Sequence, residues 1–326
     1  MNRRLLAVPA ALAATSLLVA GCSAAGGPGD PGSDGVTVLA SFYPLQYVAE
    51  QVGGELVTVD NLTPPSAEPH DLELAPAQAR RIGDADLVVY LSGMQPAVDD
   101  GVETRAPEHV VDAAVFADLG ATEEGAHDEH EEETHDEHEE ETHEEDGHDH
   151  GSTDPHFWLD PSRMAALGQA VADELAVVDP EHADEYAAGA LRLGREMDEL
   201  DQEFADGLAT CEGATFVTSH AAFGYLAERY SLHQVGLASF DPETEPSPAR
   251  LREVGDIARD AGVTTIYSET LVSPKVAETL AADLGLETAT LDPLEGLSDD
   301  ATAAGADYLS VMRENLAALE EGLVCE

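Results

Sequence analysis

One long run of helical sequence divides this chain into two parts. Residues 180–209 contain no proline after the first position, and apolar side chains recur at mostly helical spacing, at Tyr186, Leu191, Leu193, Met197, Leu200 and Phe204. At 1.5 Å per residue, such a helix would be on the order of 40 Å long. This length suits a rigid connection between two domains, and 326 residues with 43% apolar content are enough to give each domain its own core.

Apolar strands alternate with helical segments on both sides of this helix. We expect strands at 36–42, 55–64 and 87–93 in the first half, and at 214–219, 233–239, 263–269 and 287–293 in the second. Helices are expected between them, and a last helix at about 301–323. The alternation predicts an α/β fold with parallel sheets. The predicted organisation is two Rossmann-like lobes, residues 36–179 and 210–326, joined by the helix at 180–209.

A charged, low-complexity tract interrupts the first lobe at residues 121–151. It holds 16 of the 67 acids and no Lys or Arg, and the unit HDEHEEET occurs twice, at 127–134 and 135–142. Such a segment cannot form a core, and we expect it to be disordered without a ligand. Its histidines are His127, His130, His135, His138, His143, His148 and His150. Pairs three residues apart could chelate metal ions, so the tract is either an auxiliary metal-gathering loop or a solubilising loop with incidental metal affinity.

The acidity of the chain is global. Outside the tract, 51 acids face 14 bases, and the formal net charge of the whole chain is −53. Such a surface repels nucleic acid and anionic headgroups and attracts cations. We therefore expect no nucleic-acid partner.

The N-terminus has the features of an export signal. Arg3 and Arg4 precede an apolar stretch from Leu5 to Ala20, and small residues lead up to Cys22. The ending VAGC resembles a bacterial lipobox, which predicts a signal peptide at 1–22 with Cys22 as the lipid anchor. The alternative, a membrane-spanning helix, needs about 20 apolar residues, and this run is shorter. Residues 23–35 are rich in Gly, Pro and Ser and predict a flexible tether to the outer face of the cytoplasmic membrane.

Two further cysteines, Cys211 and Cys325, remain in a chain predicted to be exported. In an oxidising compartment we expect them to form a disulfide, and two free buried thiols are the alternative. In the chain-entropy description, closing so long a loop contributes about 4 to 5 kcal/mol.

Three histidines stand where α/β sheets bind ligands. His70 follows a predicted strand, His156 lies in DPHFWLDP between two prolines, and His220 ends the strand at 214–219. Three neutral imidazoles need one more ligand for a tetrahedral zinc shell, and a carboxylate is the usual supplement. Asp292, at the end of the last predicted strand, and Glu295, just past it, both qualify. The other histidines outside the tract are interpreted as surface residues: His109, His182 and His233.

Six motifs now carry a family resemblance. In order along the chain they are PHDLELAP, DPHFWLDP, TSHAAFGYLAERY, DPETEPSP, ETLVSPKVAETLA and LDPLEGL. Together they resemble the metal-binding solute receptors of bacterial ABC importers, the ZnuA-type zinc lipoproteins, from about Val36 to Leu323. The resemblance implies a metal site in the cleft between the two lobes, with His70, His156 and His220 as ligands. It favours Asp292 as the fourth ligand, with Glu295 or water as alternatives.

The resemblance also implies a function. We expect an exported, monomeric receptor without enzymatic activity that delivers Zn²⁺ to a membrane permease. Manganese-binding members usually lack a histidine-rich insertion and carry an acid in place of His220, so this chain favours zinc. The alternatives are a manganese receptor, an adhesin, and a zinc hydrolase using Glu68 or Asp71 beside His70; the chain contains no HExxH motif.

Overall fold

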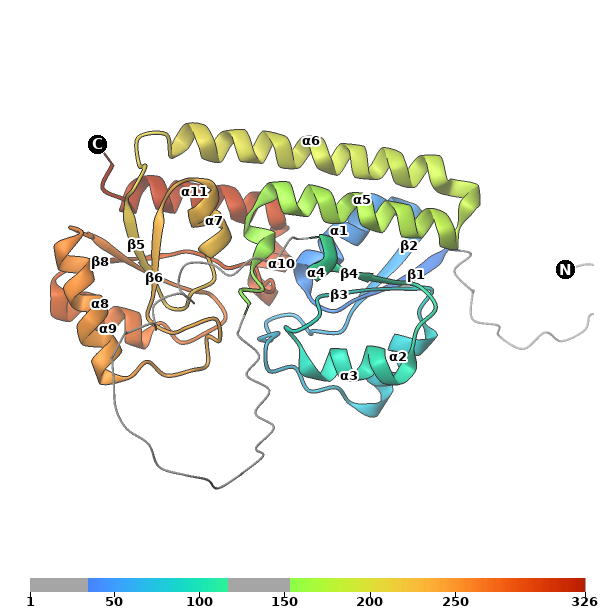
Figure 1. Cartoon of the computed structure of the whole chain (residues 1–326), viewed down its shortest axis with the longest axis horizontal. Coiled ribbons are helices and arrows are strands. Elements are labelled where there is room, and N and C mark those ends of the chain that lie inside the picture. Colours follow the sequence, from blue (N-terminus) through green and yellow to red (C-terminus); the bar gives the residue numbers. More distant parts are fainter. Residues whose placement is uncertain (1–34, 117–152, 326) are drawn as a thin grey trace, which may run out of the picture. The chain divides into compact units, whose positions relative to one another are not determined.

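The computed structural model describes residues 35–116 and 153–325 (Figure 1). This part of the chain is built around two four-stranded sheets, each made of parallel strands. Both sheets belong to one compact unit, Gly35–Glu326. The predicted signal peptide with Cys22, the tether up to residue 34 and the histidine-rich tract lie outside the described residues. Within the described ranges, no helix combines the length and apolarity needed to cross a bilayer.

The first sheet has the strand order β2-β1-β3-β4. Its strands are β1 (Val36–Ala40), β2 (Val57–Asn61), β3 (Leu87–Tyr90) and β4 (Val110–Asp112). The two central strands, β1 and β3, are mostly apolar because both faces of this sheet are covered. Val38 and Val89 face a large core, whereas Leu39 and Val88 face a small one on the opposite side. The flanking helices are α1 (Tyr43–Gly53), α2 (Pro76–Asp84), α3 (Pro96–Arg105) and α4 (Ala113–Phe116).

The second sheet repeats the same arrangement, with the strand order β6-β5-β7-β8. Its strands are β5 (Thr215–Thr218), β6 (His233–Gly236), β7 (Thr265–Ser268) and β8 (Glu287–Thr290). The helices of this half are α7 (Gly224–Arg229), α8 (Pro248–Asp260), α9 (Lys275–Leu284), α10 (Asp299–Ala304) and α11 (Tyr308–Gly322). Every strand pair in both sheets is parallel, so the α/β class with parallel sheets is confirmed.

The long helix predicted between the halves is α6 (Ala183–Gly207). It packs against α1 and α5 (Pro161–Val178) at the first sheet and against α11 at the second. Gly189 lets α6 approach the end of α1 closely, because a Cβ there would lie 2.2 Å from the Val52 carbonyl oxygen. No helix was predicted at the position of α5, which runs beside α6 as a second long helix (Figure 1).

The two sheets share one continuous core around Trp158. The Trp158 indole Nε1 donates a hydrogen bond to the Pro293 carbonyl at 2.7 Å, and the Tyr308 hydroxyl donates one to the Trp158 carbonyl at 2.6 Å. The Trp158 and Tyr308 side chains are buried in the same cluster as Phe42 and Phe204. Burying both partners makes these bonds costly to break, so the segment around Trp158 is firmly held against the second lobe.

The predicted helix at 301–323 is two helices. Gly305 adopts a left-handed conformation (φ 79°) that ends α10, and Asp307 then caps α11 by accepting a hydrogen bond from the Ser310 amide.

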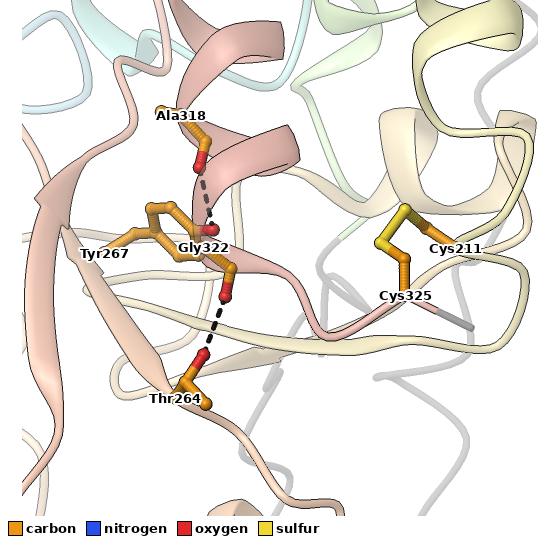
Figure 2. The surroundings of a disulfide bond; sticks show 6 residues. All are labelled: Cys211, Thr264, Tyr267, Ala318, Gly322 and Cys325. Carbon is orange, nitrogen blue, oxygen red and sulfur yellow. Dashed lines mark hydrogen bonds between the residues drawn. A yellow bond between two sulfur atoms is a disulfide. The ribbon is translucent and has the colours of Figure 1, made fainter.

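The C-terminus is fixed to the second lobe at the end of α11. Figure 2 shows the predicted disulfide between Cys211 and Cys325, which the structure contains. Beside it, Thr264 donates a hydrogen bond to the Gly322 carbonyl at 3.0 Å, and the Tyr267 hydroxyl donates one to the Ala318 carbonyl at 3.2 Å. The bond from Thr264 satisfies the Gly322 carbonyl, which lies at the end of α11 and has no partner within the helix.

Candidate metal centre

His70 lies on the irregular connection between β2 and α2. The backbone amide of His70 donates to Glu68 Oε1 at 3.0 Å. Gln95, buried at the start of α3, donates to the Pro69 carbonyl and to the Thr63 hydroxyl, both at 3.1 Å. These bonds hold the loop at the carboxyl edge of the first sheet, and the His70 side chain keeps 12% of its surface exposed.

His156 is completely buried at the start of the short 3₁₀ turn Phe157–Leu159. Asp154 Oδ1 accepts hydrogen bonds from the His156 backbone amide at 2.9 Å and makes a hydrogen bond with the ring nitrogen Nδ1 at 2.7 Å. Asp154 is itself wholly buried. One carboxylate oxygen therefore sets both the backbone and the ring of His156.

His220 follows β5 and is also completely buried. The Thr218 hydroxyl donates to the His220 carbonyl at 2.6 Å. Glu269, just after β7, accepts a hydrogen bond from the His220 amide at 3.0 Å, and its Oε1 lies 2.7 Å from His220 Nδ1. The ring contact is an ion-pair distance without the alignment of a hydrogen bond.

Glu295 is the carboxylate that the structure brings to the three histidines. Its Oε1 lies 3.1 Å from His156 Nε2, 3.1 Å from His220 Nε2 and 3.3 Å from His70 Nε2. One ligand atom from each of these four residues lies within 4.8 Å of the others. Histidines that are 86 and 64 residues apart thus converge on one point, with their Nε2 atoms directed at the same oxygen.

Asp292, which we expected as the fourth ligand, is outside this group, and Glu295 takes its place. The Asp292 carboxylate accepts hydrogen bonds from the Thr270 hydroxyl and the Leu294 amide, both at 2.8 Å. Leu294 adopts a left-handed backbone conformation (φ 57°), so the chain turns sharply after Asp292. The turn directs the next side chain, Glu295, into the centre, where it is 1% exposed.

The electrostatics of the site follow from burying one carboxylate among imidazoles. Burial alone would raise the pKa of Glu295, but its hydrogen bonds with His156, His220 and His70 hold the pKa well below its usual range. Burial lowers the pKa of His156 and His220, yet the nearby carboxylates outweigh it and raise the pKa of both, that of His220 to about 10. A metal ion binding here displaces protons from the rings.

Glu68 is a further carboxyl group close to the centre. Burial and the charge of Glu295 raise the pKa of Glu68 to about 9, so this side chain is neutral near pH 7. Glu68, Asp154 and Glu269 were not predicted as parts of the site, except that Glu68 was considered for a hydrolase. All three stand next to or inside the quoted motifs, but only the tertiary structure shows what they contact.

The remaining histidines of the described residues lie elsewhere. His109 pairs with Glu174 on α5 at 2.7 Å, and His182 pairs with Asp179 at 2.6 Å. His233 is exposed at the start of β6. They were interpreted as surface residues: His233 is exposed, whereas His109 and His182 are only partly exposed. The tract histidines and Cys22 lie outside the described residues.

The sequence matches a known family over residues 38–322, described as "ZnuA: Zinc-uptake complex component A periplasmic". It is 36% identical over 318 residues to the high-affinity zinc uptake system protein ZnuA of Bacillus subtilis (strain 168), covering 96% of both chains. It is 34% identical over 292 residues to the zinc-binding lipoprotein AdcA of Streptococcus pneumoniae (strain R6), with 88% of this chain and 55% of that protein covered. The chain therefore spans about half the length of the AdcA proteins.

Solved structures agree with the sequence comparison. The Zn(II)-bound AdcA of Streptococcus pneumoniae superposes with a TM-score of 0.71 at 30% identity, over 88% of this chain and 57% of that one. The laminin-binding protein Lmb of Streptococcus agalactiae, described as a bifunctional protein with adhesin and metal transporting activity, gives 0.72 at 30% identity, over 88% and 99%. With its two parallel sheets and its group of three histidines and one glutamate, this chain belongs to the ZnuA family of zinc-uptake binding proteins.

Proposed function

We propose that this protein is an extracytoplasmic receptor that binds Zn²⁺ and delivers it to an ABC importer. The observation that carries the proposal is the convergence of three Nε2 atoms and one carboxylate oxygen within 4.8 Å of one another. Membership of a family described as zinc-uptake components supports the same function. The zinc is cargo, so the site has to bind it firmly and still release it to the membrane partner.

The donor set favours zinc among the metals such receptors carry. Zinc prefers four ligands in a tetrahedral arrangement, and imidazole nitrogens with one carboxylate are among its usual ligands. Manganese and magnesium suit sites rich in oxygen, whereas copper(II) would bind these nitrogens at least as strongly. Selectivity against copper therefore depends on the geometry that the buried rings impose and on which metal is available.

We propose His70, His156, His220 and Glu295 as the four zinc ligands. Asp292 instead supports the turn that presents Glu295, since its carboxylate is bound to the Leu294 amide and the Thr270 hydroxyl. The isosteric pair Glu295→Gln and Asp292→Asn separates the two assignments. Zinc titration of the metal-free protein should show that Glu295→Gln lowers zinc affinity at least ~100-fold, which is more than the loss of a ligand's hydrogen-bond partner usually causes. Asp292→Asn should lower zinc affinity much less. The reverse order would restore Asp292 as the ligand.

The metal itself is tested by competition. Metal-free protein should bind zinc more tightly than manganese in calorimetric titrations, and crystals grown with zinc should give an anomalous signal at the zinc edge among the four side chains. Tighter binding of manganese would overturn the assignment of the cargo.

The proposal includes export and anchoring. The signal-like N-terminus and the lipobox-like VAGC support a receptor held by a lipid on Cys22 at the outer face of the membrane, acting as a monomer with the permease as partner and without enzymatic activity. In cells given a labelled fatty acid, the wild-type chain should incorporate label and Cys22→Ser should not. Label on the Cys22→Ser chain would exclude this anchor.

The histidine-rich tract is proposed to gather zinc for this site. The seven histidines and sixteen acids between residues 121 and 151 supply many weak ligands. Deletion of residues 125–150 should lower the number of zinc ions bound per chain and leave one tight site. An unchanged stoichiometry would leave only a solubilising role for the tract.

A further inference from the structure

Two buried carboxylates stand behind the zinc-site histidines, on the ring nitrogens that face away from Glu295. Asp154 Oδ1 lies 2.7 Å from His156 Nδ1, and Glu269 Oε1 lies 2.7 Å from His220 Nδ1. The same oxygen atom also accepts the backbone amide of its histidine, at 2.9 Å for His156 and 3.0 Å for His220. The Asp154 and Glu269 side chains are 0% and 3% exposed.

This repeated contact has a defined chemical effect on an imidazole ring. A carboxylate beside Nδ1 keeps the proton on that nitrogen, so Nε2 presents its lone pair to a metal ion. The negative charge also makes the ring a stronger donor. Because the backbone amide of the same residue holds this oxygen in place, the ring cannot turn without losing its contact with the carboxylate.

His70 lacks this support. Its backbone amide bonds to Glu68 Oε1, but among the described residues no carboxylate is found against its Nδ1. It is also the only one of the four with a partly exposed side chain. The site therefore has a preset part, made of His156, His220 and Glu295, and a fourth ligand on a loop.

We propose that Asp154 and Glu269 are positioning residues of the zinc site, which hold His156 and His220 with Nε2 directed at the metal before it arrives. This inference rests on the proposed zinc-binding function. Neither carboxylate is placed as a ligand, since each meets its ring at Nδ1, the nitrogen that faces away from Glu295. His70 completes the shell after the preset part has captured the ion.

The matched test compares three isosteric substitutions in the whole protein. Asp154→Asn and Glu269→Gln remove the charge behind a zinc-site histidine. Glu174→Gln removes a carboxylate that lies at the same 2.7 Å from a histidine Nδ1, that of His109, outside the site. Zinc affinity is measured by competition with a chelator, and the visible spectrum of the Co²⁺-loaded protein reports how many ligands surround the ion.

Substituting the hydrogen-bond partner of a metal-binding histidine typically lowers metal affinity 10- to 100-fold. We expect Asp154→Asn to lower zinc affinity by about this factor. Glu269→Gln should lower it less, because the contact between Glu269 and His220 Nδ1 is not aligned as a hydrogen bond. The Co²⁺ bands should weaken in both variants as the coordination loosens. Glu174→Gln should match the wild type, and Asp154→Glu, which restores a carboxylate, should recover part of the affinity.

Wild-type affinity and unchanged Co²⁺ bands in both Asp154→Asn and Glu269→Gln would overturn the inference. Urea unfolding of each metal-free variant identifies one that does not fold, and the other variant then decides. A different result addresses the proposed function: if the wild type binds no zinc, or if His156→Ala binds it as tightly as the wild type, the zinc assignment itself fails.

Discussion

The two sides of the metal centre present the same chemical group with very different support. On one side, His156 and His220 are completely buried, and a carboxylate contacts the far nitrogen of each ring. On the other side, His70 lies on a loop and keeps 12% of its side chain exposed. The comparison suggests a division of roles within one set of ligands, in which some residues give tight binding of the metal ion and another controls its entry and release. We propose that the buried side retains the ion and that the exposed side, with His70, admits and releases it.

The largest expected effect comes from removing a ligand on the buried side. His156→Ala should abolish tight zinc binding and also lower the free energy of unfolding of the metal-free protein by about 3–5 kcal/mol, because Asp154 would remain buried without its partner. Zinc titration and urea unfolding measure the two effects. A metal-free protein as stable as the wild type would show that the buried side is not held together by this pair.

The second prediction concerns the disulfide between Cys211 and Cys325, which lies in the same lobe as His220 but away from the metal centre. The double substitution Cys211→Ser and Cys325→Ser should lower the free energy of unfolding by about 2–5 kcal/mol. Zinc affinity should stay unchanged, because Cys211 precedes β5 and His220 follows it at the opposite edge of the sheet. Denaturant unfolding under oxidising conditions and zinc titration make the comparison, and a large loss of affinity would contradict it.

The third prediction concerns the exposed side. His70→Ala should speed the release of zinc to a chelator and lower affinity, while the unfolding free energy of the metal-free protein changes by less than about 1 kcal/mol, since no buried charge loses its only partner. Stopped-flow release and urea unfolding test this directly. If His70→Ala were as destabilising as His156→Ala, the two sides would not differ in the way described.

The smallest effect is expected at a surface contact that supports the segment after His220. Arg229, at the end of α7, donates to Asp201 Oδ2 on α6 at 2.7 Å, and Tyr230 donates to Asp201 Oδ1 at 2.9 Å. The hydrogen bond from Arg229 lowers the pKa of Asp201 below its ordinary 3.8. Because the folded pKa is depressed, the stabilisation is complete above pH 3.8 and is lost as the pH falls through the lower, folded value.

Asp201→Asn should therefore lower the free energy of unfolding by about 0.2–1 kcal/mol near neutral pH, as expected for a partly exposed ion pair. The difference from the wild type should vanish in strong acid. Urea unfolding at several pH values measures it, with zinc affinity at neutral pH as the control. A difference that grew on acidification would contradict the assigned sign.

Much of the fold was predictable because it depends on local patterns. Strands such as Leu87–Tyr90 are recognisable as short apolar runs between helical segments, and α6 is recognisable from its apolar spacing. The division of the last helix was missed, although Gly305 and Asp307 are local signals for a helix end and a helix start. Helix α5 was missed as well, since no prediction covered residues 161–178.

The sequence by itself determined the α/β class, the candidate pair Cys211 and Cys325, and the three histidines, because strand ends and residue types are local properties. Only the tertiary structure shows that Glu295, and not Asp292, lies against the three histidines, since the left-handed turn at Leu294 sets which side chain points there. It also paired Glu269 with His220, 49 residues apart in the sequence. Contacts of this kind depend on how two sheets and their loops pack, and no local pattern encodes that packing.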